Sequence, residues 1–178
     1  MDHFYHNIQG WFGFDGLYQQ MVKEAGPLAH FVEVGAWKGR SAAYMAVEIA
    51  NSGKNIKFDV VDTWQGSLEH QTDPSITNDT LYLEFLANMK PAEDYYTARR
   101  MPSLEAAESY PDGSLDFVLI DASHEYADVR ADILAWLPKI RPGGTLAGDD
   151  YNWPGVKQAV NELLTYHKRQ GIYWTVKK

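Results

Sequence analysis

Four side chains that could carry out chemistry lie in the second half of the chain, each shortly after a short apolar segment. They are Asp121, His124, Asp149 and Asp150. The two segments, Leu115–Ile120 and residues 145–148, are typical of buried parallel strands, because each is a short apolar run bounded by turn residues. Ligands bind beyond the carboxyl ends of the strands in an open α/β sheet, so we expect the four side chains to meet there.

Three carboxylates at one edge of a sheet would repel one another unless they are protonated or bridged by a cation. An oxygen-rich cluster suits a hard divalent metal such as Mg²⁺ or Mn²⁺, and an imidazole beside it suits a general base. These residues therefore predict a metal site formed by Asp121, Asp149 and Asp150, with His124 as the catalytic base. Two simpler interpretations stay open: His124 could cap the following helix, and Asp149 alone could bind a ligand without metal.

A glycine-containing turn, GAWKG at residues 35–39, follows a first predicted strand at His30–Val34. Glycine lets the backbone approach a ligand closely, and the start of the helix predicted at 41–50 offers free N–H groups. Glu33 stands where a dinucleotide-binding turn has its first glycine, and a carboxylate there repels phosphate but attracts an ammonium group. The turn therefore argues against a nicotinamide dinucleotide, although Glu33 could also be an ordinary surface acid.

Asp62 follows the second predicted strand, at residues 56–61, where an acid typically binds the two hydroxyls of a ribose. Together, Glu33 and Asp62 favour a ligand that carries an ammonium group and a ribose but no phosphate, and S-adenosylmethionine is such a ligand. Either acid alone could instead be a turn residue.

Strands and helices alternate along the whole chain, which predicts an α/β fold with a doubly wound, mostly parallel sheet in one domain over residues 1–178. The other predicted elements are helices at 17–25, 80–89, 103–108, 126–137 and 156–168, and strands at 95–98 and 172–176. We also expect a tight turn at 141–144 and a polar loop at 65–78, which is long enough to suggest a functional role.

The composition indicates a folded globular protein, with 45% hydrophobic and 13% aromatic residues. A formal net charge of -8 argues against nucleic acid and anionic membrane surfaces as partners. The absence of cysteine excludes disulfides and thiolate metal sites. We find no apolar run long enough to span a bilayer and no basic start typical of a signal peptide, so the expected location is the cytoplasm.

The chain resembles the class I S-adenosylmethionine-dependent methyltransferases, and more narrowly the small family of macrocin-type sugar O-methyltransferases and cephalosporin hydroxylase-like proteins. The matching blocks are GWF at 10–12, FVEVGAWKGRS at 31–41, VVDTW at 60–64, Ser103, LDFVLIDASHEY at 115–126 and RPGGTLAGDDY at 141–151. The last two blocks, which contain IDxxH and GDDY, are the most specific.

This resemblance implies a Rossmann-like fold and a role for each matching residue. The predicted cofactor contacts are Glu33, Gly35, Ala36, Gly39, Asp62, Trp64, Ser103 and Asp121. Among them, Glu33 and Gly35 would line the methionine end, Asp62 would bind the ribose and Ser103 would lie near the adenine. Trp64 could stack near the adenosine or fill the space between strand and helix. The three aspartates would hold Mg²⁺ and His124 would be the base.

The implied activity is methyl transfer from S-adenosylmethionine to a hydroxyl of a small molecule or sugar, assisted by Mg²⁺ or Mn²⁺. Tyr151 and Trp153 are candidates for a wall of the acceptor site. The alternatives are a nicotinamide-dependent oxidoreductase and a non-catalytic cofactor- or metal-binding module. One expected strand follows the last helix, so we expect the family's C-terminal hairpin to be missing or completed by a partner. The identity of the acceptor and a homo-oligomeric state are left open.

Overall fold

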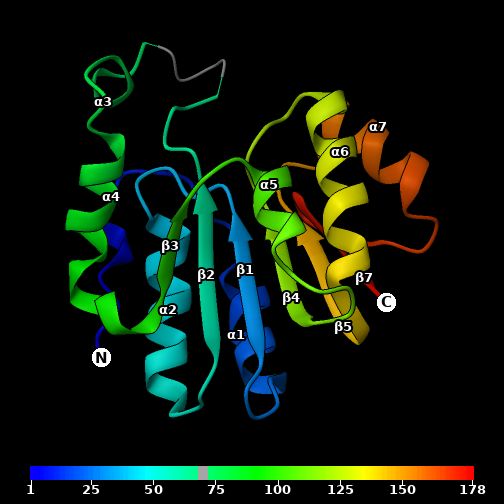
Figure 1. The fold of residues 1–178 in the computed structure, drawn as a ribbon, viewed down its shortest axis with the longest axis horizontal. Helices are drawn as coiled ribbons and strands as arrows, with labels where there is room; N and C mark the ends of the chain where they lie inside the picture. Colours follow the sequence, from blue (N-terminus) through cyan, green and yellow to red (C-terminus); the bar gives the residue numbers. More distant parts are fainter. Residues whose placement is uncertain (68–71) are drawn as a thin grey trace.

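In the computed structural model, which describes residues 1–67 and 72–178, the described strands form one sheet. The strands are β1 (His30–Val34), β2 (Lys57–Asp62), β3 (Thr97–Arg100), β4 (Leu115–Ile120), β5 (Ile140–Gly148), β6 (Lys168–Gln170) and β7 (Tyr173–Lys177). Their order across the sheet is β3-β2-β1-β4-β5-β7-β6 (Figure 1). The first five strands run parallel, whereas β7 lies antiparallel to both β5 and β6.

Helices cover both faces of this sheet (Figure 1). They are α1 (Asp15–Glu24), α2 (Arg40–Ser52), α3 (Pro74–Thr77), α4 (Leu81–Met89), α5 (Ser103–Glu108), α6 (Tyr126–Trp136) and α7 (Pro154–Leu163), with shorter 3₁₀ turns η1 (Tyr5–Asn7), η3 (Lys90–Tyr95) and η4 (Leu137–Lys139). One face carries α1, α2 and α4, and the other carries α5, α6 and α7. Among the described residues, no helix combines the length and apolar character needed to cross a bilayer.

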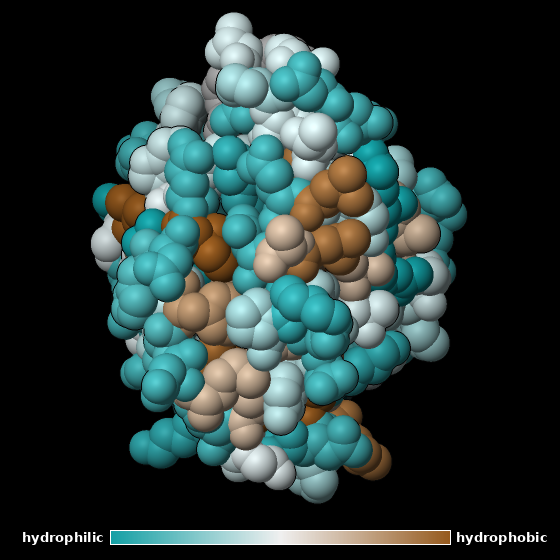
Figure 2. All heavy atoms as spheres, turned by 90° about the vertical axis from the view of Figure 1, so that its left-hand side faces the viewer, coloured by the Kyte–Doolittle hydropathy of each residue, from teal (hydrophilic) through white to brown (hydrophobic). Residues whose placement is uncertain are grey.

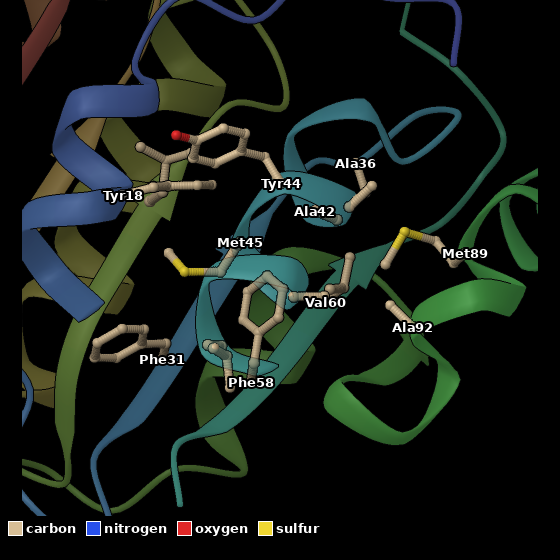
Figure 3. Close-up of a cluster of buried hydrophobic side chains, with 14 of the residues drawn as sticks. Tyr18, Phe31, Ala36, Ala42, Tyr44, Met45, Phe58, Val60, Met89 and Ala92 are labelled. Carbon is tan, nitrogen blue, oxygen red and sulfur yellow. The ribbon is translucent and has the colours of Figure 1, made fainter. Parts of the chain in front are cut away.

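The alternation of side chains along each strand divides the core into two layers. Phe31 of β1 and Phe117 of β4 pack with the helices of the first face, whereas Val32 and Val118, the next residues in each strand, pack with those of the second. Figure 3 shows part of the first layer, where side chains from α1, α2 and the strands meet. Because both faces are buried, these strands are mostly apolar, with Glu33 of β1 and Asp116 of β4 among the exceptions.

The outer surface over α4 and η3 is mixed, with hydrophobic residues in separate spots among hydrophilic ones (Figure 2). Leu83 of α4 is one exposed apolar residue on this helix. Isolated exposed apolar side chains are normal on soluble proteins, so this surface gives no sign of a partner.

The doubly wound sheet is confirmed, but the expectation of a missing C-terminal hairpin is wrong. The last helix was predicted to continue to residue 168, yet it ends at Leu163, because Leu164 leaves the helical region with φ -119° and ψ 86°. The following residues form β6, which pairs with β7 inside the same chain. The chain therefore completes its own sheet.

Two smaller predictions also change. The tight turn expected at 141–144 is part of β5, which passes through it with a register shift opposite Leu115 and Phe117. The polar loop at 65–78 contains the short helix α3, and residues 68–71 of that loop lie outside the described residues.

Candidate active site

The site is built where the chain changes from one face of the sheet to the other, between β1 and β4. The Asp121 N–H donates to the Val34 carbonyl at 2.7 Å, so the turns after the two strands begin side by side. Gly35 has φ +89°, and a Cβ on it would lie 2.1 Å from the Asp121 carbonyl oxygen. Only glycine fits there, so Gly35 allows the two turns to touch at the switch point, where open α/β sheets bind ligands.

Asp62, at the end of β2, fastens the glycine turn. Its Oδ2 accepts hydrogen bonds from the backbone N–H groups of Ala36 and Trp37, at 2.7 and 3.0 Å, and its Oδ1 accepts from Trp64 N–H at 2.8 Å. An ionised carboxylate can accept about four hydrogen bonds, so acceptor capacity remains for a ligand hydroxyl. Asp62 thus holds the turn, and its contact with a ribose stays a prediction.

Trp64 belongs to the same arrangement but lies inside the protein. Its indole N–H donates to the Trp37 carbonyl at 2.9 Å, and its ring packs against Tyr82 and Phe85 of α4 with 1% of the residue exposed. Both Trp37 and Trp64 have positive φ angles, which are uncommon for residues other than glycine. This burial favours the interpretation of Trp64 as a filler between strand and helix over a stacking contact with adenosine.

Glu33 is fully buried below the turn, facing the first core layer. Its two oxygens accept hydrogen bonds from Tyr18 of α1, at 2.7 Å, and Ser41 of α2, at 2.6 Å. Burial raises the pKa of Glu33 to about 7, although these two hydrogen bonds favour the ionised form. The carboxylate therefore ties both helices to β1, and its contact with a cofactor ammonium stays a prediction.

Two further predicted cofactor residues have clear structural tasks. Gly39 caps the start of α2 with φ +93°, and a Cβ there would lie 3.0 Å from the Phe85 ring, so the backbone angle and the packing of α4 both favour glycine at this position. Ser103 donates a hydrogen bond to Asp132 of α6 at 2.5 Å and accepts one from Trp136 at 2.8 Å. The Ser103 hydroxyl thus joins α5 to α6, and its proximity to adenine stays a prediction.

A cluster of metal-binding type forms at the carboxyl ends of β4 and β5. One ligand atom each of Asp121, His124 and Asp150 lies within 4.8 Å of the other two. His124 Nε2 lies 2.7 Å from Asp150 Oδ2, and the imidazole stacks on Trp153 with ring centroids 4.5 Å apart. Asp150 has φ +55°, so the backbone has left the strand there. That turn is the condition for neighbouring strand residues to face one site.

Asp149, the third predicted ligand, lies beside this trio rather than in it. Its Oδ1 is buried and has no hydrogen-bond partner among the described residues. The pKa of Asp149 is raised to about 6, mainly by burial and to a smaller extent by the neighbouring Asp150 carboxylate. Burial also holds the pKa of Asp121 well above its usual range, with added repulsion from Asp149 and Asp150. A cation would relieve this repulsion, so the residues present fit a divalent metal.

A cavity of about 10 Å³ opens among these groups. Its polar lining includes all four predicted residues, Asp121, His124, Asp149 and Asp150, together with Trp174 of β7. Sequence reasoning missed Trp174, because an aromatic residue in a strand is usually just part of the core. It also missed Tyr18 and Ser41, because their role as hydrogen-bond donors to Glu33 becomes visible only in the folded structure.

The two candidates for an acceptor wall differ in exposure. Tyr151 is buried, and its hydroxyl donates to Asn161 of α7 at 2.7 Å, so its place in an acceptor wall stays a prediction. Trp153 is 42% exposed and covers His124, which keeps it a candidate.

Comparison with known proteins gives consistent results. Residues 32–151 match a family described as a methyltransferase domain. The O-methyltransferase NovP is similar in structure, with a TM-score of 0.67 and 18% identity over 92% of this chain and 79% of that one. An O-methyltransferase from Bacillus cereus, solved in complex with SAH, gives a TM-score of 0.62 and 16% identity over 97% of this chain and 86% of that one. At these identities the likeness shows the fold.

One curated relative matches in sequence. The uncharacterized protein y4gI of Sinorhizobium fredii (strain NBRC 101917 / NGR234) is 30% identical over 111 residues, which cover 62% of this chain. The match spans only 12% of that relative's own length.

Proposed function

The chain belongs to the family described as a methyltransferase domain, and we propose that it is a class I S-adenosylmethionine-dependent enzyme that methylates a hydroxyl oxygen of a small molecule or sugar with the help of Mg²⁺ or Mn²⁺. The observation that carries this proposal is the cluster of Asp121, His124 and Asp150 directly beside the Gly35 turn. The similar structures whose names describe O-methyltransferases support the same choice of acceptor atom.

In this proposal, the cofactor lies over the turns after β1 and β2. Asp62 binds the ribose through its remaining acceptor capacity, and Gly35 and Ala36 bring the backbone close to the methionine end. The carboxylate cluster would then lie next to the methionine end, because the turn after β4 begins beside the turn after β1. Holding the cofactor and the acceptor next to each other in this arrangement is the main contribution of the protein to the rate.

Asp121, Asp149 and Asp150 would hold the divalent metal, which supplies a Lewis acid that lowers the pKa of the acceptor hydroxyl. The acceptor oxygen attacks the methyl carbon as the carbon–sulfur bond breaks, which gives a methyl ether, S-adenosylhomocysteine and one proton. The proton passes to His124, and the imidazolium so formed is stabilised by Asp150, 2.7 Å away. Trp153 stacks on the imidazole and limits its rotation.

The structure offers a second role for His124, because its ring lies within the metal-binding trio itself. The two roles can be separated by measuring Mn²⁺ binding with electron paramagnetic resonance in wild type, His124→Ala and Asp121→Asn. If His124 is a base that does not bind metal, His124→Ala should retain its affinity for Mn²⁺ while Asp121→Asn should lose it. Loss of affinity in both variants would make His124 a ligand.

The experiment that tests the proposed function has two stages. Calorimetry first measures binding of S-adenosylhomocysteine, for which we expect micromolar affinity and a gain in stability of about 2.7 kcal/mol at a ligand concentration 100-fold above Kd. A panel of sugar and catechol-like diols is then tested with labelled S-adenosylmethionine and Mg²⁺. Folded protein that binds neither cofactor form would overturn the proposal.

A further inference from the structure

Two buried polar atoms beside the carboxylate cluster have no partner in the described part of the chain. One is Nε1 of Trp174, a residue with 1% exposure, and the other is Oδ1 of Asp149. Both residues line the cavity of about 10 Å³ at the ends of β4 and β5. Buried polar groups nearly always have hydrogen-bond partners, so an unpaired donor and an unpaired acceptor beside one cavity call for an explanation.

The hairpin β6–β7 brings the Trp174 indole to this place. Trp174 pairs with Gly148 across the antiparallel strands β7 and β5. A Cβ on Gly148 would lie 2.4 Å from the indole ring and 2.7 Å from its Nε1, so the ring fits only because residue 148 is glycine. Asp149 is the next residue in the chain. The pairing of β5 with β7 therefore places the indole N–H beside the backbone that carries the Asp149 carboxylate.

The chemistry of the two atoms restricts what can occupy the cavity. An indole N–H only donates a hydrogen bond, and an ionised carboxylate oxygen only accepts one. A metal ion held by the carboxylates cannot accept a hydrogen bond, so it would leave the indole N–H without a partner. A group that satisfies both must accept one hydrogen bond and donate another, which is the property of a hydroxyl oxygen. A volume of 10 Å³ is about the minimum for one water molecule.

We propose that this cavity is a binding site for a single resident water, which accepts a hydrogen bond from Trp174 Nε1–H and donates one to Asp149 Oδ1. The water fixes the Asp149 carboxylate beside Asp121 and Asp150. Trp174 is thereby a positioning residue of the carboxylate site. That last role depends on the proposed methyl transfer, whereas the water site itself does not.

The first test is a high-resolution crystal structure of the wild-type protein without metal or acceptor. We expect one ordered oxygen within hydrogen-bonding distance of Trp174 Nε1 and Asp149 Oδ1. An empty cavity, or an indole N–H paired with a protein atom, would overturn the proposal. If density appears in the cavity only after a diol is added, the proposal of a resident water is wrong, and the cavity binds the acceptor hydroxyl instead. Cross-relaxation between the indole proton and a long-lived water, measured by NMR, gives the same answer without any variant.

The second test compares Trp174→Phe, which removes the donor but keeps an aromatic ring, with Trp136→Phe. Trp136 is also fully buried and donates through its indole N–H, but to Ser103 of α5. Both variants should lose stability. Only Trp174→Phe should lose the ordered oxygen in the crystal structure. At saturating cofactor, its kcat should also fall roughly three- to tenfold, which is the equivalent of one hydrogen bond.

Normal kcat in Trp174→Phe, or an equal loss of kcat in both variants, would exclude a positioning role. If the wild type itself shows no methyl transfer, the proposed function fails, but the crystal structure still decides the water site.

Discussion

Gly35 lies against the main chain of Asp121 so closely that a Cβ on Gly35 would be 2.1 Å from the Asp121 carbonyl oxygen. Through this contact, the turn proposed to face the cofactor and the strand end that carries the carboxylates have fixed positions relative to each other. A side chain at residue 35 would have to separate them.

Gly35→Ala should therefore reduce stability by about 3 kcal/mol or more, because steric overlap and a positive φ both oppose the methyl group. Urea denaturation measures the change. Gly16→Ala is the control, since a Cβ at that position in α1 meets nothing within 4 Å and alanine favours a helix. If the two variants are equally stable, the close contact does not exist in solution.

Asp62→Asn should weaken S-adenosylhomocysteine binding by roughly tenfold or more, because a hydrogen bond to a charged group is stronger than one to an amide. The retained oxygen can still accept from Ala36 and Trp37 while the bond from the Trp64 N–H is lost, so the protein should remain folded but less stable. Calorimetry on the variant and on Asp112→Asn, an exposed acid far from the turn, checks the result. Unchanged affinity in Asp62→Asn would leave Asp62 with a purely structural role in the turn.

Glu33 should make the protein less stable as the pH rises. Its pKa is raised from 4.5 to about 7 by burial, so the folded state binds the proton more tightly than the unfolded state. The resulting stabilisation is fully present below about pH 4.5 and is lost as the pH rises through 7, with a total of about 3 kcal/mol.

Glu33→Gln removes this titration while other acids titrate equally in both proteins. The free energy of unfolding of the variant, minus that of wild type, should therefore rise between pH 5 and pH 8. Urea denaturation at several pH values measures this difference. A difference that stays constant with pH would show that Glu33 is ionised in the folded protein at all these values.

His124→Ala should lower kcat by about 10²–10⁴-fold, the usual effect of removing a positioned general base. Cofactor affinity should stay nearly unchanged, because His124 pairs with Asp150 and stacks on Trp153, both of which follow β5 rather than the Gly35 turn. His6→Ala, at an exposed position, serves as control. A variant that loses cofactor affinity or unfolds would identify His124 as a structural residue.

Much of the fold could be predicted because apolar strands buried on both faces are easy to recognise. The predicted limits of β1, β4 and α5 agree with the structure, and Gly35 and Asp62 stand at the strand ends as expected. The hairpin could not be predicted in this way. β6 is three exposed polar residues, KRQ, and only its pairing with β7 makes it a strand.

The sequence predicted which residue types form the site, but not which carboxylate lies next to His124. The sequence places Asp121, Asp149 and Asp150 at one edge, yet the positive φ of Asp150 turns its carboxylate toward His124 and leaves Asp149 separate. Backbone angles of this kind have no signature when the residue is not glycine. Trp174 was missed because its role depends on the antiparallel pairing with Gly148.

The most direct test of metal-assisted O-methylation is the transfer of a labelled methyl group from S-adenosylmethionine to a diol acceptor, measured with Mg²⁺ and again with excess chelator. We expect transfer to the acceptor oxygen with Mg²⁺, almost none with chelator, and recovery when Mg²⁺ or Mn²⁺ is restored. Asp150→Asn should be inactive under all these conditions. Transfer that continues unchanged in excess chelator would contradict a role for the carboxylate cluster as a metal site.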